Sequence, residues 1–249
     1  MNIANIRLIS QQIALTKYKT AQEIVNFMGA MQAQDFAMVK WAIGLRLKNS
    51  TNKIIETAIN KGEIIRTHLL RPTWHFVSAE DIHWLIELTA PKIKSSIKSR
   101  LKEFEINEKM LAQSNAIFHK ALIEESFLSR EDLLKKLTDA KIPIDNFRSS
   151  HFLFCAELDG LICSGPIKNN KQTYSLLEKR VPKYQSFSRE ESLAKLATKY
   201  FFSHFPATVQ DFIWWSGLGA TDAKNALESI KHSLFSETIN TQTYWSPRE

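Results

Sequence analysis

The stretch "EIIRTHLLRPTWHFV", residues 63–77, decides the fold of this chain. Residues 64–70 are rich in apolar and β-branched residues, and so are residues 73–77. Between the two runs, Arg71 and Pro72 form a turn signal. Two such runs around a short turn predict a β-hairpin.

The residues before this hairpin are predicted to be helical. Glycines or capping residues bound the successive apolar patterns, which indicate helices at residues 3–15, 21–28, 36–47 and 52–61. Thr20-x-x-Glu23, Ser129-x-x-Asp132 and Thr208-x-x-Asp211 each fit a capping box, in which a hydroxyl and an acid three residues later satisfy the first turn. Several helices followed by a hairpin are typical of a winged helix.

Two further copies of this order are predicted downstream. One has helices at residues 108–125, 130–141 and 146–159, followed by strands in "LICSGPIKNNKQTYSLL", residues 161–177. The other has helices at residues 189–205, 209–215 and 222–231 and one strand at residues 233–239, without a second wing strand. The expected fold class is mainly α with short β-hairpins (α+β), arranged as tandem winged-helix units. The expected domains are 1–90, 91–183 and 184–249, the second beginning with a connecting helix that Pro91 interrupts.

Composition narrows the functional classes. The 249 residues are 44% hydrophobic and 24% charged, no apolar run is long enough to span a membrane, and the N-terminus lacks a signal peptide pattern. We therefore expect a cytoplasmic, nucleoid-associated protein with no membrane partner. Cys155 and Cys163 fit neither a disulfide framework nor a zinc site, and we interpret both as buried packing residues. No metal or other cofactor is expected.

The net charge of +7 and the pI near 9.3 favour a polyanionic partner. We expect duplex DNA, contacted mainly through phosphates. In "PKIKSSIKSRLK", residues 91–102, five cations occur without an acid, and further cations lie on the two predicted hairpins. The candidate DNA-binding residues are Lys92, Lys94, Lys98, Arg100, Lys102, Arg66, His68, Arg71, Lys168 and Lys171. For any single lysine, the alternative is a solvated helix face.

The first hairpin allows two interpretations. Its aromatic and cationic side chains could insert beside a distorted base pair. Alternatively, Trp74 and Phe76 pack into the core and the arginines stay exposed, which is the interpretation that we favour for the two aromatic residues. His68 and His75 lack an obvious third partner nearby, so we discount a metal site there.

A second notable stretch is "GAMQAQDF", residues 29–36. Gln32 and Gln34 would point to opposite faces of a helix, but they share one side of an extended segment. Gly29 can release the chain from the preceding helix, and Asp35 is interpreted as the N-cap of the next one rather than as a catalytic acid. The two amides could then converge. The alternative is that they only stabilise the loop by bonding to the backbone.

Taken together, "GAMQAQDF", "IIRTHLLRPTWHFVSAEDI", "HFLFCAELDGLICSGP" and "PATVQDFIWWSGL" resemble the winged-helix DNA-binding domain family that contains the AlkZ and YcaQ type DNA glycosylases. The resemblance covers essentially the whole chain and implies tandem winged helices, usually followed by a small C-terminal β-barrel that is expected to be missing here. It also implies a Gln-x-Gln motif at the active site, matched by Gln32 and Gln34, and excision of alkylated purines, including those in interstrand crosslinks.

The chemistry of such a reaction suits a pair of glutamines. A purine alkylated at N7 or N3 is cationic and leaves readily, so the oxocarbenium-like transition state needs mainly a placed water and a nearby negative dipole. Amide carbonyl oxygens can supply both. We therefore expect a monomeric glycosylase with Gln32 and Gln34 as its catalytic residues. The alternatives are a non-catalytic winged-helix DNA-binding protein, as a regulator or an inactive relative, and a scaffold that binds only protein.

Overall fold

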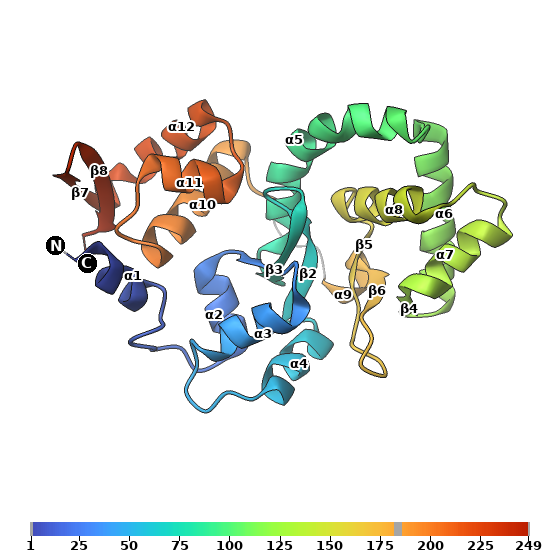
Figure 1. Cartoon of the computed structure of the whole chain (residues 1–249), viewed down its shortest axis with the longest axis horizontal. Helices are drawn as coiled ribbons and strands as arrows, with labels where there is room; N and C mark the ends of the chain where they lie inside the picture. Colours follow the sequence, from blue (N-terminus) through green and yellow to red (C-terminus); the bar gives the residue numbers. More distant parts are fainter. Residues whose placement is uncertain (1, 182–185, 249) are drawn as a thin grey trace.

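The structure is a computed structural model that describes residues 2–181 and 186–248. The chain is mainly helical with small antiparallel sheets (Figure 1), which confirms the expected α+β class. In these two ranges the helices are α1 (Ile3–Ser10), α2 (Ala21–Met28), α3 (Phe36–Gly44), α4 (Asn52–Lys61), α5 (Ile82–Glu103), α6 (Glu108–Glu124), α7 (Arg130–Asp139), α8 (Asn146–Leu158), α9 (Leu177–Arg180), α10 (Arg189–Ser203), α11 (Val209–Ser216) and α12 (Ala220–Ile230). The strands are β1 (Met31–Gln32), β2 (Ile64–Leu69), β3 (Thr73–Ser78), β4 (Leu128–Ser129), β5 (Ile162–Ser164), β6 (Thr173–Leu176), β7 (Leu234–Ile239) and β8 (Gln242–Pro247).

The hairpin predicted for residues 63–77 is confirmed as β2 and β3. The two strands pair antiparallel from Ile64 opposite Ser78 to Leu69 opposite Thr73. The short strand β1 adds to the other edge of β3, which gives the sheet order β1-β3-β2. The glutamine stretch therefore belongs to the same sheet as the hairpin.

The predicted helix starts are also confirmed. Thr20, Ser129 and Thr208 each form a capping box with the acid three residues later. Asp35 caps α3 by accepting hydrogen bonds from the backbone N–H groups of Ala37 and Met38, at 2.9 and 3.0 Å. Because these bonds satisfy orphan donors of the first turn, the sequence fixes where these helices begin.

Three expectations about element boundaries are wrong. The first helix ends at Ser10, well before residue 15. Pro91 does not interrupt α5, which continues through it and is drawn as an arch in Figure 1. A proline removes one helical hydrogen bond, but the buried residues on either side of it hold the helix together. The C-terminal hairpin does have its second strand, because β8 pairs with β7 along six residues.

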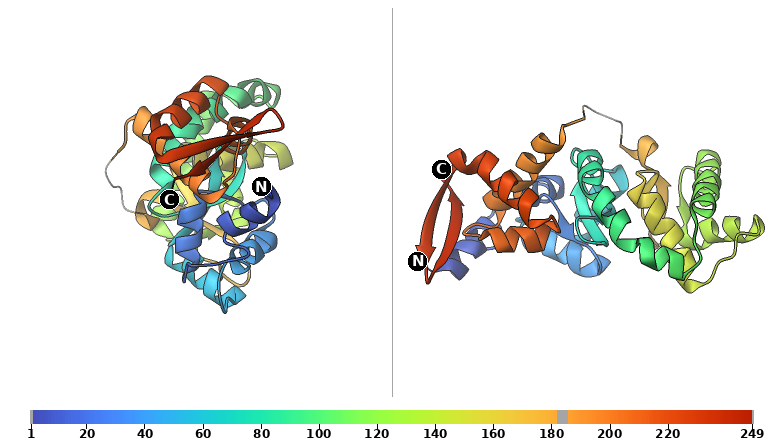
Figure 2. Two further views of the ribbon diagram at one scale, coloured as in Figure 1. Left: turned by 90° about the vertical axis from the view of Figure 1, so that its left-hand side faces the viewer. Right: turned by 90° about the horizontal axis from the view of Figure 1, so that it is seen from above.

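The core consists of three clusters, two of which include residues of the first hairpin. One cluster joins α2, α3 and α4 to the hairpin, and another joins α6, α7 and α8 to β5 and β6. The third joins the hairpin to α5, α10, α11 and α12. All six residues of β2 are buried. This hairpin is therefore a central element, whereas β7 and β8 lie at one end of the elongated molecule and α6 and α7 at the other (Figure 2).

Candidate functional site

The glutamine stretch is extended, as its spacing predicts. Gly29 ends α2 with a positive φ of 75°, a conformation that favours glycine. From Met31 to Gln34 the residues alternate between buried and exposed, so the two glutamines lie on the exposed side while Met31 and Ala33 enter the core. We call Gln32 and Gln34 the glutamine edge.

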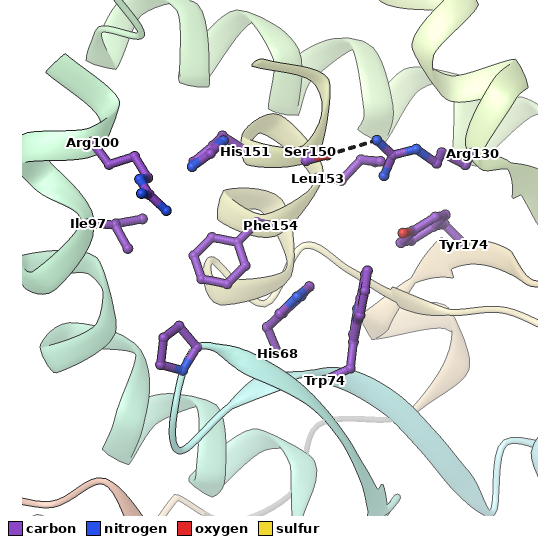
Figure 3. Close-up of a pocket in the computed structure, with 11 residues that line it drawn as sticks. His68, Trp74, Ile97, Arg100, Arg130, Ser150, His151, Leu153, Phe154 and Tyr174 are labelled. Atoms are coloured by element: carbon purple, nitrogen blue, oxygen red, sulfur yellow. Dashed lines mark hydrogen bonds between the residues drawn. The ribbon is translucent and has the colours of Figure 1, made fainter. Parts of the chain in front are cut away.

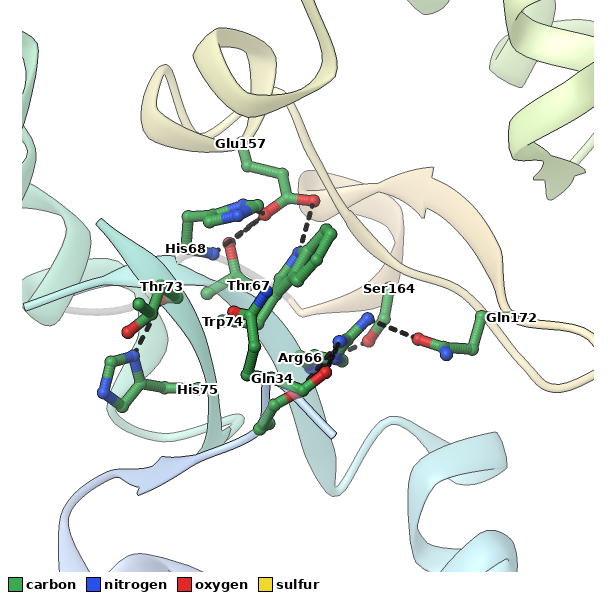
Figure 4. A network of polar contacts seen from close by, with 11 residues as sticks. Gln34, Arg66, Thr67, His68, Thr73, Trp74, His75, Glu157, Ser164 and Gln172 are labelled. Atoms are coloured by element: carbon green, nitrogen blue, oxygen red, sulfur yellow. Dashed lines mark hydrogen bonds and ion pairs between the residues drawn. The ribbon is translucent and has the colours of Figure 1, made fainter. Parts of the chain in front are cut away.

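Backbone bonds and Arg66 hold the glutamine edge in place. The N–H of Ala33 donates to the carbonyl of Trp74 at 2.7 Å. From β2, the Arg66 guanidinium donates to the carbonyl of Ala33 at 2.8 and 2.9 Å and to that of Gln34 at 3.3 Å (Figure 4). Within the described residues, neither glutamine amide has an intramolecular partner, so both remain available for a water or a ligand.

The expected exposure of the arginines of the first hairpin is wrong for Arg66. Its guanidinium lies over the ring of Trp74, at 4.2 Å from the centroid, and donates to the side chain of Gln172 at 2.5 Å. Burial lowers the pKa of Arg66, although a guanidinium keeps its charge in proteins. The physical reason is that β5 and the neighbouring loop cover this face of the hairpin. That Arg66 contacts a DNA phosphate stays a prediction, whereas its hydrogen bonds to the backbone of the glutamine edge are seen in the structure.

His68 is likewise buried, and its partner is a carboxylate that the sequence analysis did not identify. Glu157 on α8 accepts a hydrogen bond from the backbone N–H of His68 at 2.8 Å and lies 2.6 Å from Nδ1 of its ring. The indole N–H of Trp74 points at the other carboxylate oxygen, at 3.5 Å (Figure 4). The side chain of Glu157 is only 1% exposed. A lone acid inside the apolar run "FLFCAEL" was the signal that could have revealed it.

The aromatic residues of the hairpin have separate surroundings. Phe76 is fully buried in the cluster formed with α2, α3 and α4, as expected. Trp74 is only partly buried, and it lines a cavity together with His68. Tyr174 of β6 lines the same cavity, and burial raises the pKa of its phenol, so the hydroxyl stays protonated. Arg71, the other cation of the hairpin, lies at the turn and lines a different cavity beside Trp214 and Trp215.

The predicted basic residues divide by their partners. Lys92 donates to the carbonyl of Gly217 at 2.6 Å, and Lys94 pairs with Asp159 at 2.5 Å. Across the described ranges, no ion pair involves the remaining three cations of α5 or the two at the turn between β5 and β6, all of which are exposed: Lys98, Arg100, Lys102, Lys168 and Lys171. These five remain open to an external anion.

Three further observations concern the rest of the described chain. Cys155 and Cys163 are buried free thiols, which confirms the interpretation as packing residues, and burial raises the pKa of each to about 12. Within the described part of the chain, no three side chains of the metal-binding types gather into a potential metal site. Nor does any helix there combine the length and apolar character that crossing a bilayer requires.

The exposed glutamine edge thus lies beside a central hairpin, and the exposed cations without an ion-pair partner in the described chain lie on α5 and at the turn between β5 and β6. A family model described as "DNA glycosylase AlkZ-like" matches residues 25–246. The chain therefore belongs to the AlkZ-like DNA glycosylase family, which confirms the resemblance seen in the sequence.

Comparison with solved structures agrees with this assignment. The DNA glycosylase AlkZ of Streptomyces sahachiroi superposes with a TM-score of 0.78 at 16% sequence identity, over 97% of this chain and 68% of that protein. At this identity the match shows the fold alone. The DIP2311 protein of Corynebacterium diphtheriae gives a TM-score of only 0.23, at 11% identity over 85% of this chain and 39% of that one, which carries no argument. No curated protein matches the sequence.

Proposed function

We propose that this chain is a monofunctional DNA glycosylase that hydrolyses the N-glycosidic bond of purines alkylated at N7 or N3, including those in interstrand crosslinks. Family membership supports the glycosylase class. The observation that carries the finer proposal is the glutamine edge, whose two amides are exposed and without partners in the described chain, while Arg66 and Trp74 fix the backbone between them.

The proposed reaction needs little acid catalysis. The water oxygen forms a bond to C1′ as the bond from C1′ to the purine nitrogen breaks, and that electron pair neutralises the cationic purine. The water proton passes to solvent. The carbonyl oxygens of Gln32 and Gln34 hold the water and face the positive charge that develops on the sugar. An amide is too weak a base to take the proton, and its contribution is orientation.

The remaining parts of the proposal concern DNA. We infer that residues 1–90, 91–183 and 184–249 form three winged-helix units that bind duplex DNA as a monomer on the nucleoid in the cytoplasm. The exposed cations Lys98, Lys102, Lys168 and Lys171 would contact phosphates. An interaction of this kind weakens as salt rises, which distinguishes it from a protein-binding scaffold.

The test is release of N7-methylguanine from alkylated duplex DNA under single-turnover conditions. We expect the wild type to release the base and Gln32→Ala and Gln34→Ala to slow release by about 100-fold each, the scale for removing one oriented polar group. Gln22→Ala is the matched control, because Gln22 lies on α2, away from the edge. Equal rates in all four proteins would remove the glutamines from the mechanism. DNA binding without release by the wild type would favour a non-catalytic DNA-binding protein.

A further inference from the structure

A cavity of about 280 Å³ lies between the first hairpin, α5, α8 and β6 (Figure 3). Sites for small molecules begin at roughly 300 Å³, so this space suits one flat ring system whose larger substituents lie at the rim. Its walls are largely aromatic: the ring centroid of His68 lies 4.3 Å from that of Trp74 and 4.5 Å from that of Phe154. Tyr174 and His151 complete the aromatic lining.

A buried carboxylate fixes the hydrogen-bonding character of this cavity. A carboxylate oxygen of Glu157 lies 2.6 Å from Nδ1 of His68, so this ring nitrogen is already engaged. In the described chain, Nε2 has no hydrogen-bond partner, so this nitrogen remains available to the polar edge of a ligand. The same carboxylate faces the indole N–H of Trp74. The side chains of His68 and Trp74 are therefore held in place before any ligand binds.

Two arginines give the cavity a cationic rim. They lie on opposite sides in Figure 3, Arg100 from α5 and Arg130 from α7. Arg130 donates to the hydroxyl of Ser150 at 3.0 Å, which orients its guanidinium. Among the described residues, no acid lines the cavity. Guanidinium groups suit phosphate because they bind it through parallel hydrogen bonds.

The cavity also adjoins the glutamine edge. One ring, that of Trp74, separates them: the Arg66 guanidinium that holds Gln34 contacts this indole from one side, and His68 contacts it from the other. A nucleotide whose sugar lay at the glutamine edge would thus have an aromatic site beside it.

We propose that this cavity binds a purine nucleotide, with the base against the aromatic side chains, its polar edge on Nε2 of His68 and its phosphate at the rim on Arg130. The role in DNA repair rests on the proposed function, since the nucleotide would then be the one whose base is excised. Binding of a free nucleotide does not depend on excision. The two proposals can therefore fail separately.

Calorimetric titration of the intact protein tests the ligand class. The probes are 7-methylguanosine 5′-monophosphate, the same nucleoside without phosphate, and inorganic phosphate. We expect the monophosphate to bind at least about tenfold more tightly than the nucleoside and phosphate alone to bind undetectably, because stacking and charge act together. If inorganic phosphate displaces the nucleotide at equal concentration, the site is only an anion patch and the proposal is wrong.

Variants locate the binding. Ile97→Trp, on α5, fills the cavity and should weaken nucleotide binding at least about tenfold. The matched control is Ile123→Trp on α6, at an exposed position outside the cavity, which should bind as the wild type does. Arg130→Met should lose about tenfold for the monophosphate and little for the nucleoside. Equal binding by both tryptophan variants would overturn the proposal.

Excision assays on the same proteins separate this proposal from the proposed function. Excision by the wild type without nucleotide binding would reject the cavity and leave the glycosylase intact. Nucleotide binding that Ile97→Trp abolishes, without excision by any protein, would support the cavity and reject the enzyme.

Discussion

The glutamine edge and the cavity lined by His68 lie on two sides of Trp74, but their polar groups are positioned in different ways. At the edge, the two amides are exposed and free of partners in the described chain, and the backbone around Ala33 fixes where they stand. In the cavity, the carboxylate of Glu157 is 1% exposed and side-chain bonds fix it. The backbone of the sheet therefore positions the first site, and a buried carboxylate positions the second.

The difference follows from the cost of burial. An exposed neutral amide keeps its hydration and needs no compensating partner, so it can wait at a surface for a water or a sugar. A buried carboxylate is tolerated only when donors surround it. We therefore expect changes at the edge to alter chemistry with little effect on folding, and changes beneath the cavity to alter folding first.

The largest effect should come from Glu157→Ala. It leaves the donors of His68 and Trp74 unpaired in a buried place, so the free energy of unfolding should fall by about 4 kcal/mol. Glu157→Gln keeps one acceptor and should cost about half as much. Urea unfolding measures both, with the exposed Glu178→Ala as the control, expected within about 0.5 kcal/mol of the wild type. A loss under about 1 kcal/mol for Glu157→Ala would show that the carboxylate does not organise this region.

The second effect concerns His75, which pairs with Gln32 across the sheet. Burial lowers the pKa of His75 to about 4 from its ordinary value of 6.5. Between these values the unfolded chain takes up a proton and the folded protein does not, so this contribution to stability is complete above pH 6.5 and is lost as the pH falls toward 4. The loss reaches about 3 kcal/mol at pH 4.

Urea unfolding of His75→Asn at about pH 7 and about pH 4 measures this contribution. The variant should lose about 3 kcal/mol less than the wild type between the two values. The exposed His232→Asn should follow the wild type. If His75→Asn loses as much unfolding free energy as the wild type between these pH values, His75 takes up a proton in the folded state. The sheet beside the glutamine edge would then be open to solvent.

A third effect joins the two regions, because Arg66 contacts both. Arg66→Met removes the bonds to the carbonyls of Ala33 and Gln34 and should cost about 2 kcal/mol of unfolding free energy. The glutamines should then sit less accurately, which slows single-turnover excision by about tenfold. Arg66→Lys keeps the charge but lacks the several donors of a guanidinium. Its stability and its excision rate should therefore lie between those of the wild type and those of Arg66→Met. An unchanged excision rate in Arg66→Met would mean that the backbone alone positions the edge.

The smallest effect should follow Lys98→Ala with Lys102→Ala. If both lysines neutralise phosphates, the slope of log affinity against log salt should decrease by about 0.9 for each lysine removed, whatever the DNA sequence. The control pair Lys109→Ala and Lys120→Ala, on the outer helix α6, should leave the slope unchanged. Equal slopes for both pairs would exclude the α5 lysines from the DNA interface.

Much of the fold could be predicted because its signals are local. The capping boxes at Thr20, Ser129 and Thr208 and the hairpin at residues 63–77 each depend on side chains within a few positions of one another. The alternation around Gln32 and Gln34 likewise reports the face of each side chain. Helix ends were harder to predict, since the last turn of a helix depends on what packs against it, as at Ser10.

Only part of the candidate site could be predicted from local sequence patterns. The pattern of β2 places Arg66 and His68 on one face but does not say what covers that face. The cover comes from Glu157, 89 residues further along the chain from His68, and from Ser164, 98 residues from Arg66. No pattern of neighbouring residues indicates contacts between segments so far apart in the sequence.

By itself the sequence determined the α+β class, the hairpin, the starts of the helices and an extended segment with two outward amides, because dihedral preferences and side-chain periodicity act over a few residues. Only the tertiary structure decided that the hairpin is central, that Arg66 holds the glutamine edge and that Glu157 closes beneath His68. Those interactions exist because separate helices share one core, and the packing of distant segments is a property of the whole folded chain.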